Sequence, residues 1–209
     1  NASGTITGGT TLPQTTIAWS DTPNGLLNAA TVSGKYGLSL AIWQRAQLYT
    51  DDFNGDGRAD FLLIYAPNLS TDTKAYLLLA NATGSFNNAV DITTQSGMTA
   101  AYWHYSRTQV TTGDFDGDGR ADLLLQYSVS TTHKIFRLLA NTTGGFSTAV
   151  DIASLYGMTP TKWSYAAVTM ADFNGDGKSD FLVTKANGSI YTANMLTAST
   201  GGAFNTALD

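Results

Sequence analysis

Three short acidic segments in this sequence combine the residue types and the spacing of a loop that binds a metal cation. In each segment Asp or Asn stands at positions 1, 3, 5 and 9, and Gly stands at position 6. Short oxygen-bearing side chains at alternate positions of a tight loop can point at one centre, and Ca²⁺ takes six to eight oxygen ligands. Glycine at position 6 permits the positive φ of a sharp bend, and the main-chain carbonyl of position 7 can then supply one more oxygen. The predicted ligands are Asp52, Asn54, Asp56, Arg58 and Asp60; Asp114, Asp116, Asp118, Arg120 and Asp122; and Asp172, Asn174, Asp176, Lys178 and Asp180, with Arg58, Arg120 and Lys178 acting through the main chain only.

Calcium is the cation that these segments favour, with about three ions expected, one in each segment. The ligand number is high and a loop is flexible, which suits Ca²⁺ better than Mg²⁺. Zinc is disfavoured because the chain has no cysteine and neither histidine lies in a segment. An EF-hand is excluded because position 12 is Leu63, Leu125 or Val183, where that motif needs Glu. A chance turn rich in Asp and Gly could explain one segment, but three copies at a regular spacing favour a shared metal-binding role.

The composition narrows the classes of partner. All sixteen acidic residues are Asp, and ten of them lie in the three segments, so the net charge of −5 does not describe a diffuse acidic surface. Only eleven Lys and Arg residues are present and they are scattered, which argues against a nucleic-acid partner. No apolar run approaches the roughly 18 residues of a membrane helix, so membrane insertion is not expected.

The acidic segments belong to a sequence repeat. Trp43, Trp103 and Trp163 are spaced 60 residues apart, and the acidic segments are spaced 62 and then 58 residues apart. A sequence that repeats at a regular spacing is typical of arrays of small structural units. We expect a Gly/Thr-rich linker at 1–14, a partial repeat at 15–32, and full repeats at 33–92, 93–152 and 153–209, together forming one continuous β domain.

Each full repeat predicts about four strands. A strand-like stretch precedes the acidic segment, and an apolar run of strand length follows it. A polar turn leads to a third strand, and an Asn/Thr/Gly turn leads to a short fourth strand, such as 89–92. No segment has a sustained apolar period of 3.6 residues, so the fold class is predicted to be all-β. The first three strands are predicted at 46–50, 61–65 and 75–80; at 108–112, 123–127 and 135–140; and at 167–171, 181–184 and 191–196.

The segments DFNGDGRAD, DFDGDGRAD and DFNGDGKSD, each followed by an apolar strand and a later Phe turn, resemble the FG-GAP/VCBS-like calcium-binding repeats of integrin-type β-propellers. The order of Trp, acidic segment, apolar strand and Phe is also similar to fungal propeller lectins of the Psathyrella velutina type. The resemblance implies tandem four-stranded propeller blades, three full and one partial. Propellers typically have about four to eight blades, which is more than three full units and a partial one. We therefore expect the array to be completed by a second copy, as a homo-oligomer, or by the remainder of a longer chain, or else to close in an unusual way.

The function that this resemblance implies is an extracellular calcium-binding recognition module. The partner would be a glycan, as in a lectin, or a cell-surface protein, as in adhesion. The alternative is a purely structural, calcium-stabilised scaffold within a larger secreted toxin or enzyme. Millimolar extracellular calcium would fill even a weak site, so a secreted or extracellular location is expected.

Enzyme activity is not expected, because the two histidines, His104 and His133, do not recur in the other repeats. The repeated Trp residues either pack between units or stack on a sugar. The candidates for contact with a ligand are Tyr102, Trp103, His104, Tyr105, Trp163 and Tyr165.

Overall fold

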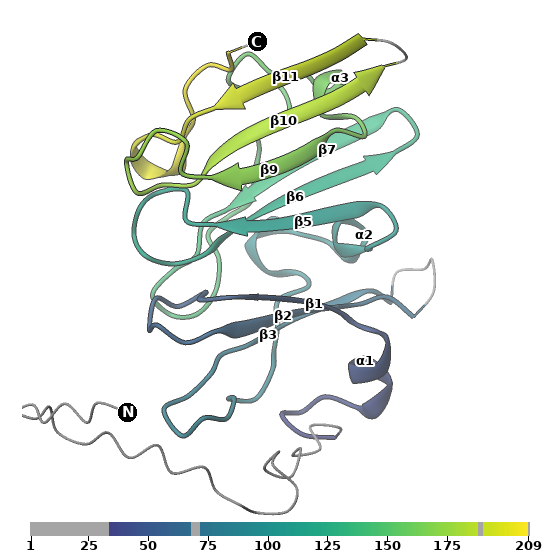
Figure 1. Ribbon diagram of the computed structural model, residues 1–209. Helices are drawn as coiled ribbons and strands as arrows, with labels where there is room; N and C mark the ends of the chain where they lie inside the picture. Colours follow the sequence, from purple (N-terminus) through teal and green to yellow (C-terminus); the bar gives the residue numbers. More distant parts are fainter. Residues whose placement is uncertain (1–33, 68–71, 188–189, 209) are drawn as a thin grey trace, which may run out of the picture. The chain divides into compact units, whose positions relative to one another are not determined.

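The described part of the chain forms three antiparallel β-sheets that lie side by side in chain order (Figure 1). The computed structural model describes residues 34–67, 72–187 and 190–208. The linker predicted at 1–14 and the partial repeat predicted at 15–32 lie outside these residues. The first sheet contains β1 (Gln47–Asp51), β2 (Asp60–Tyr65), β3 (Lys74–Leu78) and β4 (Val90–Asp91); the second contains β5 (Thr108–Gly113), β6 (Asp122–Val129), β7 (Thr132–Leu138) and β8 (Val150–Asp151); the third contains β9 (Ala167–Ala171), β10 (Asp180–Asn187) and β11 (Ile190–Leu196).

Within each sheet, neighbouring strands are consecutive in the sequence. The register places Leu48 opposite Leu63, Val110 opposite Leu125 and Val168 opposite Val183, so the three sheets repeat position for position. The third sheet has three strands and a single bridge between Met195 and Leu208 in place of a fourth. The all-β prediction is confirmed, and the sheets are consistent with propeller blades, although the row of sheets is not closed.

The apolar core lies between the sheets. The central strands β2 and β6 are fully buried over Leu62–Ile64 and Leu123–Leu125, because other side chains cover these residues on both faces of the strand. This is why they appear in the sequence as continuous apolar runs instead of alternating ones. One cluster joins the first and second sheets, and a second cluster joins the second and third. These clusters bury Trp103 and Trp163 respectively.

A short helical turn precedes the first strand of each sheet, and the sequence analysis did not predict any of these helices. They are α1 (Leu40–Arg45), α2 (Ala100–Trp103) and α3 (Pro160–Trp163). Four to six residues are too few to show an apolar period. In α3 the local signals are those of a helix start, since Thr159 accepts a hydrogen bond from the N–H of Lys162 and Pro160 occupies the first turn. None of the described helices has both the length and the apolar character needed to span a bilayer.

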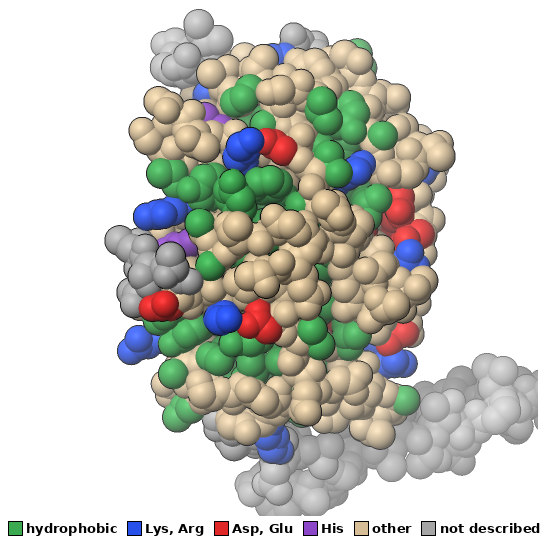
Figure 2. Space-filling view, turned by 180° about the vertical axis from the view of Figure 1, so that it is seen from behind, with side chains coloured by type: hydrophobic (Ala, Val, Ile, Leu, Met, Phe, Trp, Pro, Cys, Tyr) green, Lys and Arg blue, Asp and Glu red, His purple; other side chains and the backbone are tan. Residues whose placement is uncertain are grey.

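Charged side chains do not form a basic patch on the face shown in Figure 2. There the Lys and Arg side chains lie singly, and several of them are beside an acidic side chain. Two such ion pairs join neighbouring strands, with Lys74 Nζ 2.9 Å from Asp91 and Lys134 Nζ 2.6 Å from Asp151. A row of unpaired basic groups, which a nucleic-acid backbone would require, is therefore absent from this face of the described residues.

Candidate metal centres and a groove between two sheets

The three acidic segments form tight turns that connect the first and second strands of each sheet, along one edge of the row (left in Figure 1). In the middle turn the carboxylate of Asp114 accepts hydrogen bonds from the N–H groups of Gly117 (2.7 Å), Asp118 (3.2 Å) and Gly119 (2.8 Å). Gly117 and Gly119 have φ of +81° and +82°, a conformation that only glycine adopts readily. The first and third turns repeat these contacts from Asp52 and Asp172.

The last Asp of each turn is fully buried and connects the turn to the third strand. In the middle turn Asp122 accepts a hydrogen bond from the N–H of Phe115 (2.8 Å) and another from the N–H of Ala140 (2.7 Å). Asp60 and Asp180 make the equivalent pairs of bonds. Burial raises the pKa of Asp122 to about 7 despite these bonds, and it raises the pKa of Asp60 as well.

The middle turn gathers three carboxylates that could hold a cation. Oxygens of Asp114, Asp116 and Asp122 all lie within 4.8 Å of one another. One oxygen of Asp116 is buried and has no hydrogen-bond partner. Burial raises the pKa of Asp116, and the neighbouring charges of Asp118 and Asp114 raise it further. A buried anionic oxygen without a donor is costly, and a divalent cation at this point would supply the missing partner, so the residues fit a metal ion.

The outer turns have Asn at the place of Asp116. In the first turn the amide of Asn54 donates to Asp56 (2.9 Å), and the Asn54 oxygen accepts from the N–H of the same residue (3.0 Å). In the third turn Asn174 likewise accepts from the N–H of Asp176 (2.9 Å). These turns therefore carry one carboxylate fewer than the middle turn, and the mutual repulsion among their acidic groups is smaller.

The side chain at position 7 has a role that the sequence analysis missed. Arg58, Arg120 and Lys178 were predicted to contribute only a main-chain carbonyl. In the structure each side chain also pairs with the position-5 carboxylate of its own turn, and the Lys178–Asp176 distance is 3.2 Å. The glycine bend at position 6 brings the side chains of positions 5 and 7 to the same side of the turn. The opposite charges at these two positions were therefore a signal in the sequence for this ion pair.

Consecutive turns are joined by main-chain hydrogen bonds. The N–H of Ala121 donates to the carbonyl of Asp52 (2.8 Å), and the N–H of Ser179 donates to the carbonyl of Asp114 (2.6 Å). Each bond therefore runs from position 8 of one turn to position 1 of the preceding turn. The candidate metal centres consequently form a connected row across the sheets.

Most of the aromatic residues predicted to contact a ligand are packed inside. Trp103 and Trp163 are 1% exposed, and His104 is 3% exposed. The indole N–H of Trp103 donates to the carbonyl of Thr93 (3.1 Å). These side chains offer no free face for a sugar, and packing between sheets accounts for the repeated Trp. Tyr102 is half-buried, with its ring edge-on to Tyr127 at 5.1 Å between ring centres.

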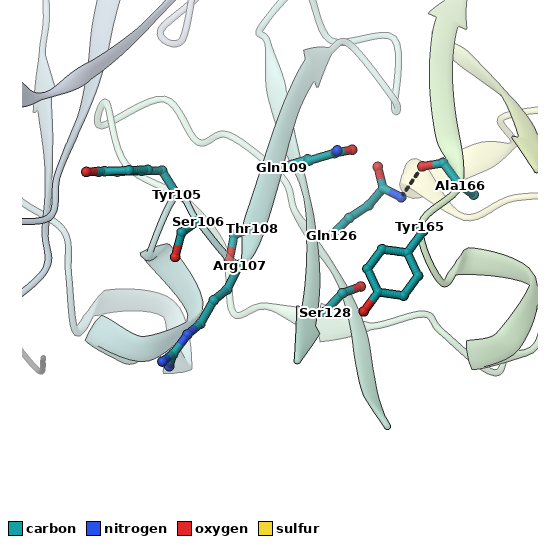
Figure 3. Close-up of a pocket in the computed structure, with 9 residues that line it drawn as sticks. All are labelled: Tyr105, Ser106, Arg107, Thr108, Gln109, Gln126, Ser128, Tyr165 and Ala166. Carbon is teal, nitrogen blue, oxygen red and sulfur yellow. Dashed lines mark hydrogen bonds between the residues drawn. The ribbon is translucent and has the colours of Figure 1, made fainter. Parts of the chain in front are cut away.

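Tyr105 and Tyr165, in contrast, are exposed and line one groove between the second and third sheets (Figure 3). The groove has a volume of about 170 Å³. In Figure 3 the side chains of Gln109, Gln126, Ser128 and Tyr165 extend toward one another, while Tyr105 and Arg107 point away from them. The nine lining residues are Tyr105, Ser106, Arg107, Thr108, Gln109, Gln126, Ser128, Tyr165 and Ala166.

Tyr165 is the most distinctive residue of this groove. Its side chain is 79% exposed, and its φ of +56° is unusual for a residue with a bulky side chain. Its ring meets that of His133 edge-on at 6.0 Å.

Gln126 was missed by the sequence analysis although a signal for it existed. It interrupts the apolar run of β6, where the first sheet has Ile64 and the third has Thr184. The Gln126 side chain is buried, and its amide donates to the carbonyl of Ala166 (3.3 Å) in the third sheet's unit. The remaining carboxamide oxygen is an acceptor that can serve a ligand in the groove.

Comparison with known proteins places the acidic turns in a recognised family of repeats. A model described as an FG-GAP-like repeat matches residues 52–125, and one described as an FG-GAP repeat matches residues 164–201. A similar solved structure is that of an Agrocybe aegerita lectin described as recognising non-reducing terminal N-acetylglucosamine, with a TM-score of 0.59 and 20% identity. The match covers 82% of this chain and 39% of that one, so the chain corresponds to about two fifths of the lectin's length. At this identity the likeness concerns the fold alone. No curated protein sequence matches the chain.

Proposed function

The chain carries FG-GAP-like propeller repeats, and we propose that it is a recognition module that binds a terminal sugar in the groove between its second and third sheets. The observation that carries the proposal is the exposed ring of Tyr165 beside Gln109, Gln126 and Ser128. An aromatic face can cover the apolar side of a sugar ring, while a few amides and hydroxyls fix its orientation.

The size of the groove supports a single sugar residue at the end of a chain. Its volume of about 170 Å³ is below the roughly 300–1,000 Å³ of ordinary small-molecule sites. The solved lectin with a similar fold is described as recognising non-reducing terminal N-acetylglucosamine, which makes this sugar the first probe. An N-acetyl group adds an amide that could pair with the carboxamide of Gln126 or Gln109.

Binding is a better account of this groove than catalysis. The nine lining residues, all in the described part of the chain, include no carboxylic acid, whereas glycoside hydrolysis generally requires a pair of carboxyl groups. The imidazole of His104 is buried and shares a hydrogen bond with Ser106 Oγ (2.9 Å). It is therefore not available to a substrate in the groove.

Calcium belongs to the same proposal, as the ion held by the acidic turns. The support comes from the middle turn, where three carboxylates converge and one buried oxygen of Asp116 has no partner. Oxygen donors of this kind suit a hard cation. The ions would stabilise the turns that order the sheets, and a secreted or extracellular setting would supply calcium at millimolar concentration.

The proposed sugar site is tested by NMR titration of the chain, in calcium, with N-acetylglucosamine. A ligand of about fifteen non-hydrogen atoms at about 0.3 kcal/mol per atom gains about 4–5 kcal/mol, so we expect a Kd on the order of millimolar. Tyr165→Ala should abolish the shifts. The matched control is Tyr191→Ala, because Tyr191 is also 79% exposed but lies on β11, outside this groove.

Two results would contradict the proposal. The first is the absence of sugar-induced shifts in the wild-type chain across the mono- and disaccharides tested. The second is binding that Tyr191→Ala removes and Tyr165→Ala leaves intact. The first result would favour the alternative, a calcium-stabilised scaffold of a larger protein.

A further inference from the structure

Each sheet has a front face, which is turned toward the preceding sheet along the chain, and a rear face, which is turned toward the next. The second sheet is covered on both faces by its neighbours. In the described part of the chain, the front face of the first sheet and the rear face of the third have no neighbouring sheet. Because the sheets repeat position for position, the burial of a residue on one of these two faces can be compared with the burial of the equivalent residue on a covered face.

The front face of the first sheet is apolar and incompletely covered. Leu48 is 45% exposed, whereas the equivalent Val110 and Val168 are half-buried against the sheet before them. Three aromatic residues of the same face are only partly buried, while their equivalents in the second and third sheets are buried. These aromatic residues are Trp43, Phe61 and Phe86.

The rear face of the third sheet is incompletely covered in the same way. Phe173 is 44% exposed, whereas the equivalent Phe53 and Phe115 are fully buried by the sheet that follows them. Leu182 is partly buried, and its equivalents in β2 and β6 are fully buried. Met195, opposite Leu182 on β11, is also partly buried.

Consecutive acidic turns contact each other through the same pair of surfaces, and the first and third turns each leave one of these two surfaces uncovered. Inside the array, the side chain of Arg120 lies against Gly55, and that of Lys178 lies against Gly117. These contacts accompany the two main-chain bonds between consecutive turns. Position 4 of one turn, a glycine, therefore receives the basic side chain at position 7 of the next turn.

At each end of the row, one of these two contacting surfaces has no partner among the described residues. At the third turn, open space lies beside Gly175, and the carbonyl of Asp172 has no hydrogen-bond partner among the described residues. At the first turn, Arg58 is exposed, and the N–H of Ala59 likewise has no partner within that part of the chain. The first turn thus presents what the third turn lacks.

We propose that copies of this chain associate head to tail, with the front face of the first sheet of one copy packed on the rear face of the third sheet of another. We assign a second copy of this chain as the partner that covers these faces. The contact between copies would involve the same residue types as the two contacts already present between consecutive sheets. Ala59 would donate to the Asp172 carbonyl of the partner subunit, and Arg58 would lie over the partner's Gly175. A closed pair is the smallest assembly that covers both faces, and head-to-tail contacts that close form rings.

The test is analytical ultracentrifugation of the wild-type chain and two variants. Leu48→Lys places a charge on the front face, and Phe173→Lys places one on the rear face. Val150→Lys is the control, because Val150 is a comparably exposed apolar residue (38%) on β8, in the sheet that already has two neighbours. We expect the wild type and the control to sediment at twice the monomer mass and each end-face variant to sediment as a monomer.

Mixing the two end-face variants provides the decisive measurement. Each variant keeps one intact end, so an equimolar mixture should recover a two-chain species through a single junction, which two copies of the same variant cannot form. Circular dichroism spectra equal to the wild type establish that both variants are folded. A wild type that stays monomeric at its highest soluble concentration overturns the proposal, and so does a mixture that stays monomeric while the wild type is dimeric.

Discussion

Phe53, Phe115 and Phe173 occupy position 2 of the three acidic turns and allow one substitution to be compared at three equivalent sites. The residue, the turn and the hydrogen bond from its N–H to the last Asp are the same each time. What differs is the sheet that follows. Phe53 packs edge-on against Phe146 at 5.9 Å between ring centres, whereas Phe173 is 44% exposed.

Substitution to Ala should therefore have unequal effects on the free energy of unfolding. At the fully buried Phe53 and Phe115, losing the ring removes its transfer energy and leaves a cavity, which costs about 3–5 kcal/mol. At Phe173 roughly half of the ring is already in water, and the vacated space opens to solvent. The loss there should be about 0.8–1.5 kcal/mol, which is half of the 1.5–3 kcal/mol for full burial.

The measurement is urea unfolding followed by tryptophan fluorescence, at a dilution where the chain is monomeric and with the calcium concentration held constant. The midpoint should fall much further for Phe53→Ala and Phe115→Ala than for Phe173→Ala, with similar slopes. Equal losses at all three positions would refute the reasoning, because they would mean that the following sheet contributes nothing to burial at position 2.

Two further predictions concern the acidic turns. Chelation should lower the melting temperature, because an ion bound only to the folded state at about a hundred times its Kd stabilises it by about 2.7 kcal/mol. Asp116→Ala removes one of the three converging carboxylates and should reduce the bound metal, measured by mass spectrometry, by one ion; unchanged metal content would count against the middle site. Burial raises the pKa of Asp122 from 3.8 to about 7, so between these pH values the folded chain without metal holds more protons than the unfolded chain. In chelator, the free energy of unfolding should therefore decline as pH rises from 4 to 7. The decline should be up to about 4 kcal/mol, at 1.36 kcal/mol per pKa unit. Asp122→Asn should flatten that decline in urea unfolding, and a stability that rises over this range would contradict the assignment.

The strands were predictable because two simple signals coincide in this chain. The apolar runs after each acidic segment have the length of a strand, whereas an amphipathic helix recognisable by its period needs about ten residues or more. Their assignment to strands is confirmed at β2, β6 and β10. The acidic segments mark the turns between strands by their spacing alone. The fourth strands were harder to place, since β4 and β8 contain only two residues each and are defined by pairing with a neighbour.

Burial of individual side chains depended on contacts that the sequence does not show. Trp103 and Trp163 are buried and Trp43 is only partly buried, although all three occupy the same repeat position. Within residues 34–208, a sheet precedes Trp103 and Trp163 but not Trp43, and this is a property of the array and not of the local residues. Two of the aromatic residues predicted to contact a ligand, Tyr105 and Tyr165, line the groove between the second and third sheets, and their contact with a ligand stays a prediction. Gln126 was overlooked because one polar residue in an apolar run was treated as an ordinary variation.

The bonds between consecutive turns have a consequence for how such a chain can evolve. Every junction joins position 8 of one unit to position 1 of the unit before it, so a single unit contains both halves of the junction. A gene duplication that copies one whole unit therefore produces an insert that meets its neighbours correctly on either side, and loss of a whole unit leaves the remaining junction intact. A deletion that ends inside a unit removes one half and leaves a neighbour unmatched. The number of sheets can therefore change by whole units without breaking a junction.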